Sequence, residues 1–411
     1  KRGDRNIRDS DRALFLEALL SARQVFYLSY LGQSLRDNQP LPPSVLVSEL
    51  LDYIGQTFDV AIDEFVIRHP LQAFSARNFQ ENSRLFSYSA ENYAAGVVSK
   101  EDRCEAPPFF DQALGEPEEK WREVEIAQLA EFFSHAPKYF LRRRLGIELP
   151  REREELEDRE PFALHSLDRY DIEQELLDDA LAGVHPQTAL EEVREAGILP
   201  PGGSGRLIFD ELCGNVTTFA DAIREQVAVE MQPPVPIRAE FGDFNLSGRI
   251  DRVRGDTLVH YRLTRLKPKD FVRIWIEHLA RNLTERKSAL LFGKEGDEIA
   301  SYEFPPMNNA REVLTELLNT YWRGLRQPLR LFPRSSWTFV ERVLAGRKKE
   351  SARYSARKDW RSNENDPNSR SEREDPYIKL AFRNIEQVLD DEWEKTSLSI
   401  FEPILSTRRR R

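Results

Sequence analysis

Two short stretches decide the fold: Gly248-Arg249-Ile250-Asp251-Arg252-Val253 and Val259-His260-Tyr261-Arg262. Both have the apolar and β-branched content of strands, and a third strand pattern precedes them at residues 236–241. A helical pattern follows at 271–281, and residues 288–304 have the pattern of a hairpin. Strands that alternate with helices in this way predict an α/β domain.

Helical spacing of apolar residues recurs on both sides of this centre. It predicts helices at 125–134, 166–181, 186–196, 209–229 and 309–323. Residues 347–375 are very polar and form either a solvated helical insertion or a loop, and we expect poor order there. Residues 400–405 are apolar again and should pack back on the domain.

The beginning of the chain has a pattern of its own. Apolar spacing predicts a helix at 11–22 and a buried strand at 25–31. Ser44 is a suitable N-cap for a further helix at 45–54. After that the composition turns to Ser, Asn and Pro, as in a linker. We therefore predict a first domain over residues 1–80, a linker over 81–118 and a second domain over 119–411.

Composition limits the class of protein. The chain has 411 residues, which suggests two or three domains. Its two cysteines, Cys104 and Cys213, lie far apart in the sequence and fit a reducing compartment such as the bacterial cytoplasm. No apolar run approaches the ~18 residues of a membrane span. Because the first residue is Lys1 and no signal pattern follows, we expect a piece of a longer cytosolic protein.

Charge gives an ambiguous indication about nucleic acid. The net charge of −10 argues against phosphate binding, which depends on Lys and Arg. Basic residues are nevertheless clustered at 142–144, 262–273 and 347–349. Local distribution matters more than the total, although exposed charge on soluble helices explains each cluster equally well.

Motifs of common catalytic sites are absent from the sequence. There is no G-x-x-x-x-G-K-[ST], so no phosphate loop holds ATP. There is no G-x-S-x-G or H-E-x-x-H either, and the six histidines occur singly. Gly202, Gly203 and Gly205 lack a preceding strand and predict a turn before a helix. We therefore expect no cofactor.

One segment near the start resembles the last motif of superfamily 1 helicases: Phe15-Leu16-Glu17-Ala18-Leu19-Leu20-Ser21-Ala22-Arg23, followed by residues 25–32. In active members an arginine immediately before the alanine reaches the nucleotide γ-phosphate, and Ser21 stands at that position here. A hydroxyl cannot replace such a charge-assisted, bidentate contact. The resemblance implies the C-terminal piece of a helicase-like lobe that has lost ATP hydrolysis.

Residues 11–55 as a whole, together with His69-Pro70-Leu71-Gln72-Ala73-Phe74-Ser75, resemble the RecC family, the gamma subunits of exodeoxyribonuclease V. The resemblance extends over nearly the whole chain and weakens after Gly324. It implies that the second domain is a degenerate PD-(D/E)XK nuclease-like α/β domain. In active nucleases of this fold, two carboxylates on neighbouring strands hold Mg²⁺ and a lysine positions or activates the attacking water.

The resemblance places three residues at the positions of that catalytic set. Asp251 stands where the first carboxylate belongs, His260 replaces the second carboxylate, and Arg262 replaces the lysine. One oxygen ligand beside a permanent positive charge should bind Mg²⁺ poorly, so we expect no metal site and no catalysis. We expect Asp251 to pair with Arg262 across neighbouring strands.

The family resemblance also implies a function. Such a subunit is a non-catalytic scaffold that works with RecB-type and RecD-type subunits in double-strand break repair and homologous recombination. It binds forked or single-stranded DNA, assists strand separation and takes part in Chi recognition. The candidate DNA-binding residues are Arg262, Lys267, Lys269 and Arg273.

Two alternatives belong to other functional classes. The chain could be an active, divergent nuclease that uses Asp251 with displaced ligands such as Asp243 or Asp256. It could also be a protein-interaction module for RecD that never touches DNA, which the acidic net charge favours.

Overall fold

The structure of the chain is a computed structural model. It describes residues 7–34, 36–37, 39–81, 84–99, 109–110, 112–150, 164–227, 230–296, 298–361, 371–382, 385 and 387–411. The chain divides into two compact units, Lys1–Ala106 and Pro107–Arg411, each of which is described by itself. No helix within the described ranges is long and apolar enough to cross a membrane.

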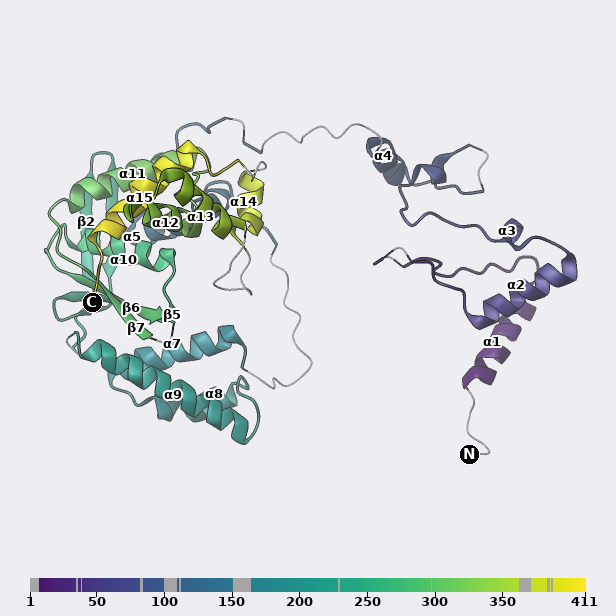
Figure 1. Ribbon diagram of the computed structural model, residues 1–411, viewed down its shortest axis with the longest axis horizontal. Helices are drawn as coiled ribbons and strands as arrows, with labels where there is room; N and C mark the ends of the chain where they lie inside the picture. Colours follow the sequence, from purple (N-terminus) through teal and green to yellow (C-terminus); the bar gives the residue numbers. More distant parts are fainter. Residues whose placement is uncertain are drawn as a thin grey trace. The chain divides into compact units, whose positions relative to one another are not determined.

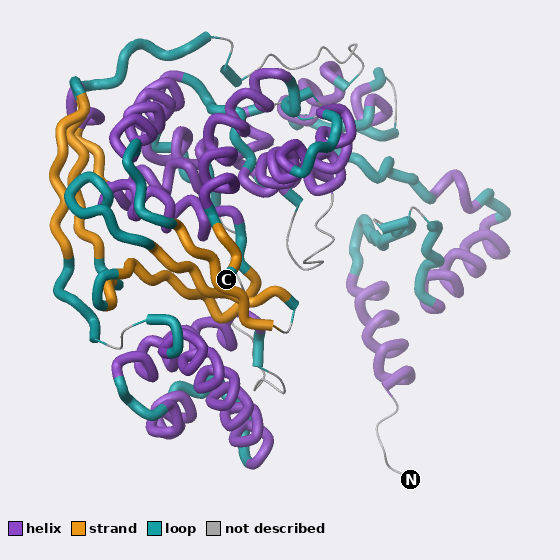
Figure 2. The backbone as a smooth tube through the Cα atoms, turned by 60° about the vertical axis from the view of Figure 1, so that its left-hand side comes forward, coloured by secondary structure: helices purple, strands orange, loops and turns teal. Residues whose placement is uncertain are grey.

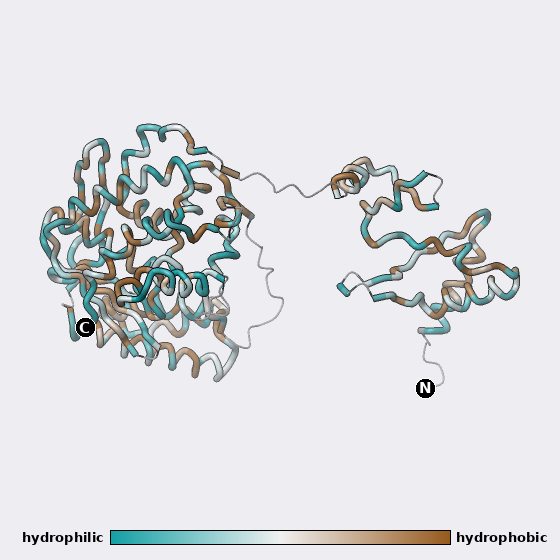
Figure 3. The backbone as a smooth tube through the Cα atoms, turned by 45° about the horizontal axis from the view of Figure 1, so that its top comes forward, coloured by the Kyte–Doolittle hydropathy of each residue, from teal (hydrophilic) through white to brown (hydrophobic). Residues whose placement is uncertain are grey.

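The first unit is helical and has a small core. Its helices are α1 (Ile7–Ser21), α2 (Val45–Phe58), α3 (Ile62–Phe65), the 3₁₀ turn η1 (Ala76–Phe79) and α4 (Ala90–Val98). The Ser44 hydroxyl caps α2 as predicted, by accepting a hydrogen bond from the Val47 amide. Among the described residues of this unit, Val47 and Leu85 are the buried apolar side chains. Hydrophobic, brown segments run along the same unit in Figure 3.

One prediction for this unit is wrong, and the predicted linker contains a helix. Residues 25–31 form no strand, and Val25, Tyr27 and Leu31 are largely exposed. A strand needs a hydrogen-bonded neighbour, and the described residues of this unit offer it none. The predicted linker 81–118 contains the ordered helix α4, in which Gly96 packs so closely on the Phe74 carbonyl that a Cβ would lie 2.7 Å from its oxygen.

The second unit contains two sheets. A three-stranded sheet has the order β1-β3-β2, and a five-stranded sheet has the order β4-β5-β6-β7-β8. The strands are β1 (Glu123–Glu125), β2 (Val235–Phe241), β3 (Phe244–Ile250), β4 (Val253–Arg254), β5 (Thr257–Arg265), β6 (Ala289–Glu295), β7 (Glu298–Phe304) and β8 (Arg409–Arg410). β5 and β6 are parallel, whereas β6 and β7 form the predicted antiparallel hairpin. The strand predictions for residues 236–304 are confirmed.

Helices cover both faces of the five-stranded sheet, as Figures 1 and 2 show. On one side lie α7 (Ser166–Ala182), η4 (Pro186–Ala189), α8 (Leu190–Glu195) and α9 (Gly203–Arg224). On the other side α10 (Pro268–Arg281) connects β5 to β6, as a parallel pair requires. The remaining helical elements are η2 (Glu119–Arg122), α5 (Ile126–Ser134), α6 (Ala136–Tyr139), the π-helix η3 (Phe140–Arg144), α11 (Ala310–Arg326), α12 (Pro333–Leu344), α13 (Lys349–Arg361), η5 (Glu372–Glu374), α14 (Pro376–Ala381) and α15 (Asp391–Thr407).

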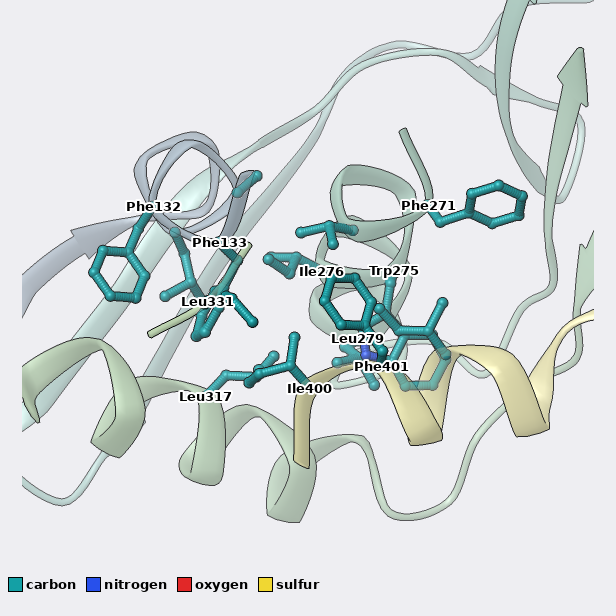
Figure 4. Close-up of a cluster of buried hydrophobic side chains, with 14 of the residues drawn as sticks. Phe132, Phe133, Phe271, Trp275, Ile276, Leu279, Leu317, Leu331, Ile400 and Phe401 are labelled. Atoms are coloured by element: carbon teal, nitrogen blue, oxygen red, sulfur yellow. The ribbon is translucent and has the colours of Figure 1, made fainter. Parts of the chain in front are cut away.

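The larger hydrophobic core lies on the α10 side. Figure 4 shows Phe132 and Phe133 of α5 with Trp275 and Leu279 of α10, all of which are almost completely buried. Gly324 of α11 is necessary for this packing, because a Cβ there would lie 2.3 Å from the Phe132 ring. The predicted return of residues 400–405 is confirmed, since α15 contributes to the same core.

Of the two alternatives predicted for the polar segment 347–375, residues 349–361 form the solvated helix. Residues 349–361 form the regular helix α13, which packs on α12 through buried Ala352, Ala356 and Trp360. These three positions follow the spacing i, i+4, i+8, which places them on one face of a helix. After residues 362–370, which lie outside the described residues, Glu372 accepts hydrogen bonds from the amides at the start of α12. In residues 349–361 the high polarity therefore reflects one solvated face of a helix.

His278 gives the first testable prediction. Burial lowers its pKa to about 4. Its Nε2–H donates to the Pro305 carbonyl, 3.1 Å away, and its Nδ1 accepts from Asn282, so the folded protein holds the neutral ring. The unfolded chain protonates histidine near pH 6.5.

Since the folded pKa is the lower one, the free energy of unfolding should be highest above pH ~6.5. It should fall by about 3 kcal/mol as the pH falls towards ~4. Urea unfolding of the protein and of His278→Gln between pH 4.5 and 7.5 measures this, and the variant should show a flatter profile. Parallel profiles would contradict it.

Candidate site on the inner face of strand β5

Alternation along β5 gives the strand a polar and an apolar side. Val259, Tyr261 and Leu263 point into the core formed with α7 and α9. Because successive side chains of a strand point to opposite faces, His260 and Arg262 point towards α10. The polar groups of interest therefore lie between β5 and its crossover helix α10.

His260 forms a nearly buried ion pair with Glu277 of α10. The distance from His260 Nε2 to Glu277 Oε2 is 2.7 Å, and the side chains are only 9% and 14% exposed. Arg273, one helical turn before Glu277, donates to its other oxygen at 3.2 Å. Burial alone would raise the pKa of Glu277, but the charge and hydrogen bond of His260, with Arg273, hold it below its usual value.

Arg262 is held in the same way. Its Nε donates to the Thr264 hydroxyl at 2.7 Å, and its Nη1 lies 3.4 Å from Asp270 of α10. The guanidinium also stacks over the ring of Tyr170, 4.7 Å from the centroid. With 18% of the side chain exposed, Arg262 has its main contacts inside the protein.

Asp251 lies just after β3 and does not pair with Arg262, so that prediction is wrong. Its carboxylate is 3.4 Å from Arg249, and 58% of the side chain is exposed. The β4–β5 pairing of Val253 with Leu258 continues in a hydrogen bond from the Val259 amide to the Arg252 carbonyl. Continued by one residue, this register places Asp251 opposite His260. His260 nevertheless binds Glu277 of α10 and not Asp251.

The donor set does not suit a divalent metal. Within the described ranges no group of three or more His, Cys, Asp or Glu side chains could hold a metal ion. The two carboxylates of α10 are already neutralised by His260 and by Arg262. Mg²⁺ prefers several oxygen ligands, and a cationic guanidinium beside the site opposes its entry.

The displaced ligands considered for an active nuclease are also engaged elsewhere. Asp243 pairs with Arg122 at 2.5 Å. Asp256 pairs with Lys287 at 2.8 Å, and the hydrogen bond and charge of that lysine lower the pKa of the carboxyl group. Neither aspartate joins Asp251 in a cluster of metal-binding side chains among the described residues.

The predicted DNA-binding residues divide into two groups. The start of α10 exposes Lys267, Lys269 and Arg273 to solvent. Arg262, on β5, is largely buried. Although Lys269 is exposed, neighbouring protein desolvates its ammonium and lowers its pKa, and the charge of Asp270 only partly offsets this. The exposed three remain candidates for phosphate contact.

Ser21, the predicted remnant of the helicase site, ends α1 in the first unit. Its hydroxyl donates back to the Glu17 carbonyl one turn earlier. Such a bond to the carbonyl four residues earlier is common for serine in a helix.

Sequence reasoning missed the two carboxylates that complete the site. Asp270 and Glu277 lie seven residues apart, two turns of one helix, so they share a face. That spacing was the available signal. It becomes meaningful only when the basic residues of β5 are known to face the same helix.

The fold and the site together define an α/β domain with a mixed sheet between two helical layers and a polar centre that is ion-paired internally. Residues 121–344 match the family model described as "RecC C-terminal domain". The chain therefore belongs to the RecC family, as the resemblance predicted.

Curated relatives agree with this assignment. A protein from Escherichia coli (strain K12) named "RecBCD enzyme subunit RecC" is 31% identical over 361 residues, 83% of this chain and 31% of that protein. A protein of the same name from Haemophilus influenzae is 32% identical, over 80% of this chain and 29% of the relative. Another, from Mycobacterium tuberculosis strain H37Rv, is 30% identical, over 88% of this chain and 33% of the relative. The chain thus spans about a third of the length of these relatives.

The ion pair at the centre of the site gives a prediction about stability. His260→Ala removes one partner and leaves Glu277 nearly buried with only the more exposed Arg273. Loss of a buried pair's partner costs about 3 kcal/mol or more, whereas Asp251→Ala, at an exposed carboxylate, should change the free energy of unfolding by less than ~0.5 kcal/mol. Denaturant unfolding at neutral pH compares the two variants. Equal losses in the free energy of unfolding would show that the contact between His260 and Glu277 stabilises the fold no more than the exposed Asp251 does.

Proposed function

We propose that this chain is a non-catalytic part of a RecC-type subunit that handles DNA within a RecBCD-type helicase–nuclease. The family assignment and the name of the relatives, RecBCD enzyme subunit RecC, support the proposal that the chain is part of such an enzyme. In this proposal residues 1–80 are the end of an inactive helicase-like lobe and residues 119–411 an inactive nuclease-like domain. Its role would belong to double-strand break repair and homologous recombination in the bacterial cytoplasm.

The observation that carries the proposal is the internal neutralisation of the β5 site. In an active nuclease of the expected class, free carboxylates at this place would bind a metal that activates water. In this chain the carboxylates near β5 are bound to His260 and Arg262 instead. The contacts that leave no carboxylate free for a metal also hold α10 against the sheet. A structural role of this kind is what we expect of a scaffold.

DNA handling rests on the exposed basic residues at the start of α10. Lys267, Lys269 and Arg273 could neutralise phosphates without reading bases, as expected for a subunit that guides forked or single strands. Assistance in strand separation and Chi recognition follows from the family resemblance and is proposed on that basis. Docking of RecB-type and RecD-type partners is proposed on the same ground.

The absence of catalysis can be tested directly. We expect the chain to cut neither single-stranded nor forked DNA in Mg²⁺ or Mn²⁺, and Asp251→Ala to behave identically. Restoring the motif residues with His260→Asp and Arg262→Lys should yield little activity, because Glu277 and Asp270 lose their contacts with His260 and Arg262 while no supporting groups for a metal are added. Metal-dependent cleavage that disappears in Asp251→Ala would overturn the proposal in favour of a divergent nuclease.

Assembly can be tested separately by co-expression. A tagged form of the chain should retain RecD-type or RecB-type subunits on an affinity column and through size-exclusion chromatography at moderate salt. Interfaces of permanent complexes are large and apolar, so retention should survive 0.5 M NaCl. Recovery of the chain without either subunit would contradict the docking role and leave the nuclease result unaffected.

A further inference from the structure

Residues 408–411, all of them arginine, lie along one edge of the five-stranded sheet. They follow α15, and Arg409 and Arg410 form the two-residue strand β8 beside β7. The antiparallel register pairs Arg410 with Tyr302 and Arg409 with Glu303. Figure 2 shows the end of the chain, marked C, beside the strands of this sheet. This segment takes no part in the β5 site.

The Arg408 guanidinium lies in a cage of three aromatic rings that come from three different elements. Its Cζ atom is 5.2 Å from the ring centroid of Phe271 on α10, 5.2 Å from that of Tyr302 on β7 and 4.8 Å from that of Trp337 on α12. Glu341, one turn after Trp337 on α12, accepts a hydrogen bond from Arg408 Nη2 at 3.0 Å. Ring faces attract a cation and the carboxylate adds the opposite charge, so the site is complementary to a guanidinium. We call Phe271, Tyr302, Trp337 and Glu341 the arginine cage.

The contacts beyond the cage are at the surface. Arg410 pairs with Glu295 at 2.9 Å and Arg411 with Glu303 at 3.0 Å, and the two arginine side chains are 58% and 47% exposed. Exposed ion pairs of this kind stabilise a fold very little. Since β8 pairs with two residues of β7, residues 298–300 have no strand neighbour on this edge within the described ranges. The edge of β7 is therefore longer than the segment that occupies it.

A charged occupant distinguishes the cage from ordinary core packing. Replacing a buried ion pair by apolar groups of similar volume is often neutral or stabilising, so a segment that only completed the core would be expected to be apolar. Helix α15 shows that pattern, since its Phe401 and Ile404 are buried. The four arginines, in contrast, can leave the sheet without exposing any apolar side chain of their own to water. Such a contact is suited to reversible binding.

From these observations we propose that the arginine cage and the adjoining edge of β7 form a binding site for an extended, arginine-bearing peptide segment of another protein, and that residues 408–411 occupy this site as an internal competitor. An arginine of the peptide enters the cage, and the backbone beside it adds a strand to β7. A planar guanidinium can stack on the rings and pair with Glu341 at the same time, which an ammonium group cannot. The inference goes beyond the proposed function, because it requires neither the β5 site nor DNA.

The test measures binding in trans to a chain that ends at Thr407, in which the cage is empty. Helix α15 retains its buried Phe401 and Ile404 in this variant, so the fold should persist. A fluorescein-labelled peptide that repeats residues 406–411 should bind it saturably in an anisotropy titration. The full chain should bind the peptide at least about tenfold more weakly, because its own arginines compete at an effective concentration in the millimolar range. Arg408→Ala in the full chain empties the cage by a second route and should bind the peptide more tightly than the unmodified chain.

Two matched comparisons separate the cage from general attraction between a basic peptide and an acidic protein. A peptide with lysine in place of its first arginine has the same charge and should bind the shortened chain at least about fivefold more weakly. Glu341→Gln in the shortened chain should weaken binding of the arginine peptide about threefold. Glu316→Gln, at an exposed carboxylate on α11, should leave it unchanged. The proposal is overturned if the full and shortened chains bind the peptide equally, if the lysine peptide binds as well as the arginine peptide, or if the two glutamate variants behave alike.

Discussion

The ion pair between His260 and Glu277 is the constraint on which the centre of the second unit depends. It joins β5 to α10, the helix that connects β5 to β6, at a point where both side chains are nearly buried. An unpaired charge at such a position is costly, so the two groups are effectively tied together. Arg262 and Asp270 repeat the same arrangement two residues along the strand. These two contacts set the rotation of α10, and with it the packing of Trp275 and Leu279 into the main core.

The same two contacts determine which chemistry the site can perform. A metal-dependent nuclease keeps carboxylates close together and unneutralised until a cation arrives, which is unfavourable for the empty protein. Here Glu277 is bound by His260 and Arg273, and Asp270 lies beside Arg262, so the protein's own side chains engage both carboxylates without a metal. Asp251 has no such internal partner on β5 or α10, and it is exposed beside Arg249. In the proposed reading, a chain that no longer needs to bind metal has replaced it with permanent ion pairs that stabilise the fold.

The sequence predicted the elements of the second unit well, because their apolar periodicity is local. The strands between 236 and 304 and most of the predicted helices lie within a few residues of their predicted limits. The exception is α9 (Gly203–Arg224), which begins six residues before and ends five residues before the predicted range 209–229 and includes Gly203 and Gly205, which were predicted as a turn. It did not predict the partners of His260 and Arg262, since Asp270 and Glu277 reach them across a strand–helix interface and no local pattern records that contact. The failure at residues 25–31 has a similar cause, because apolar residues predict a strand only if a neighbouring strand is present. For residues 347–361 the sequence left a solvated helix and a loop as alternatives, because Ala352, Ala356 and Trp360 form a narrow buried stripe in a sequence that is otherwise polar.

Net charge was the least informative property of the whole chain, and the distribution of charge explains why. Residues 166–225, which form the layer of α7 to α9, contain thirteen acidic and four basic residues and thus a net charge of −9. Almost all of the overall −10 therefore belongs to one helical layer, which packs on the face of the sheet opposite α10. At physiological salt, fields from exposed charges decay over about 8 Å, so this acidic layer does little to cancel the basic surfaces across the sheet. In the proposed role the layer would repel phosphate on its own side, while Lys267, Lys269 and Arg273 on the other side are the candidates to contact it. Asymmetry of this kind orients a polyanion on a protein whose total charge would predict no binding at all.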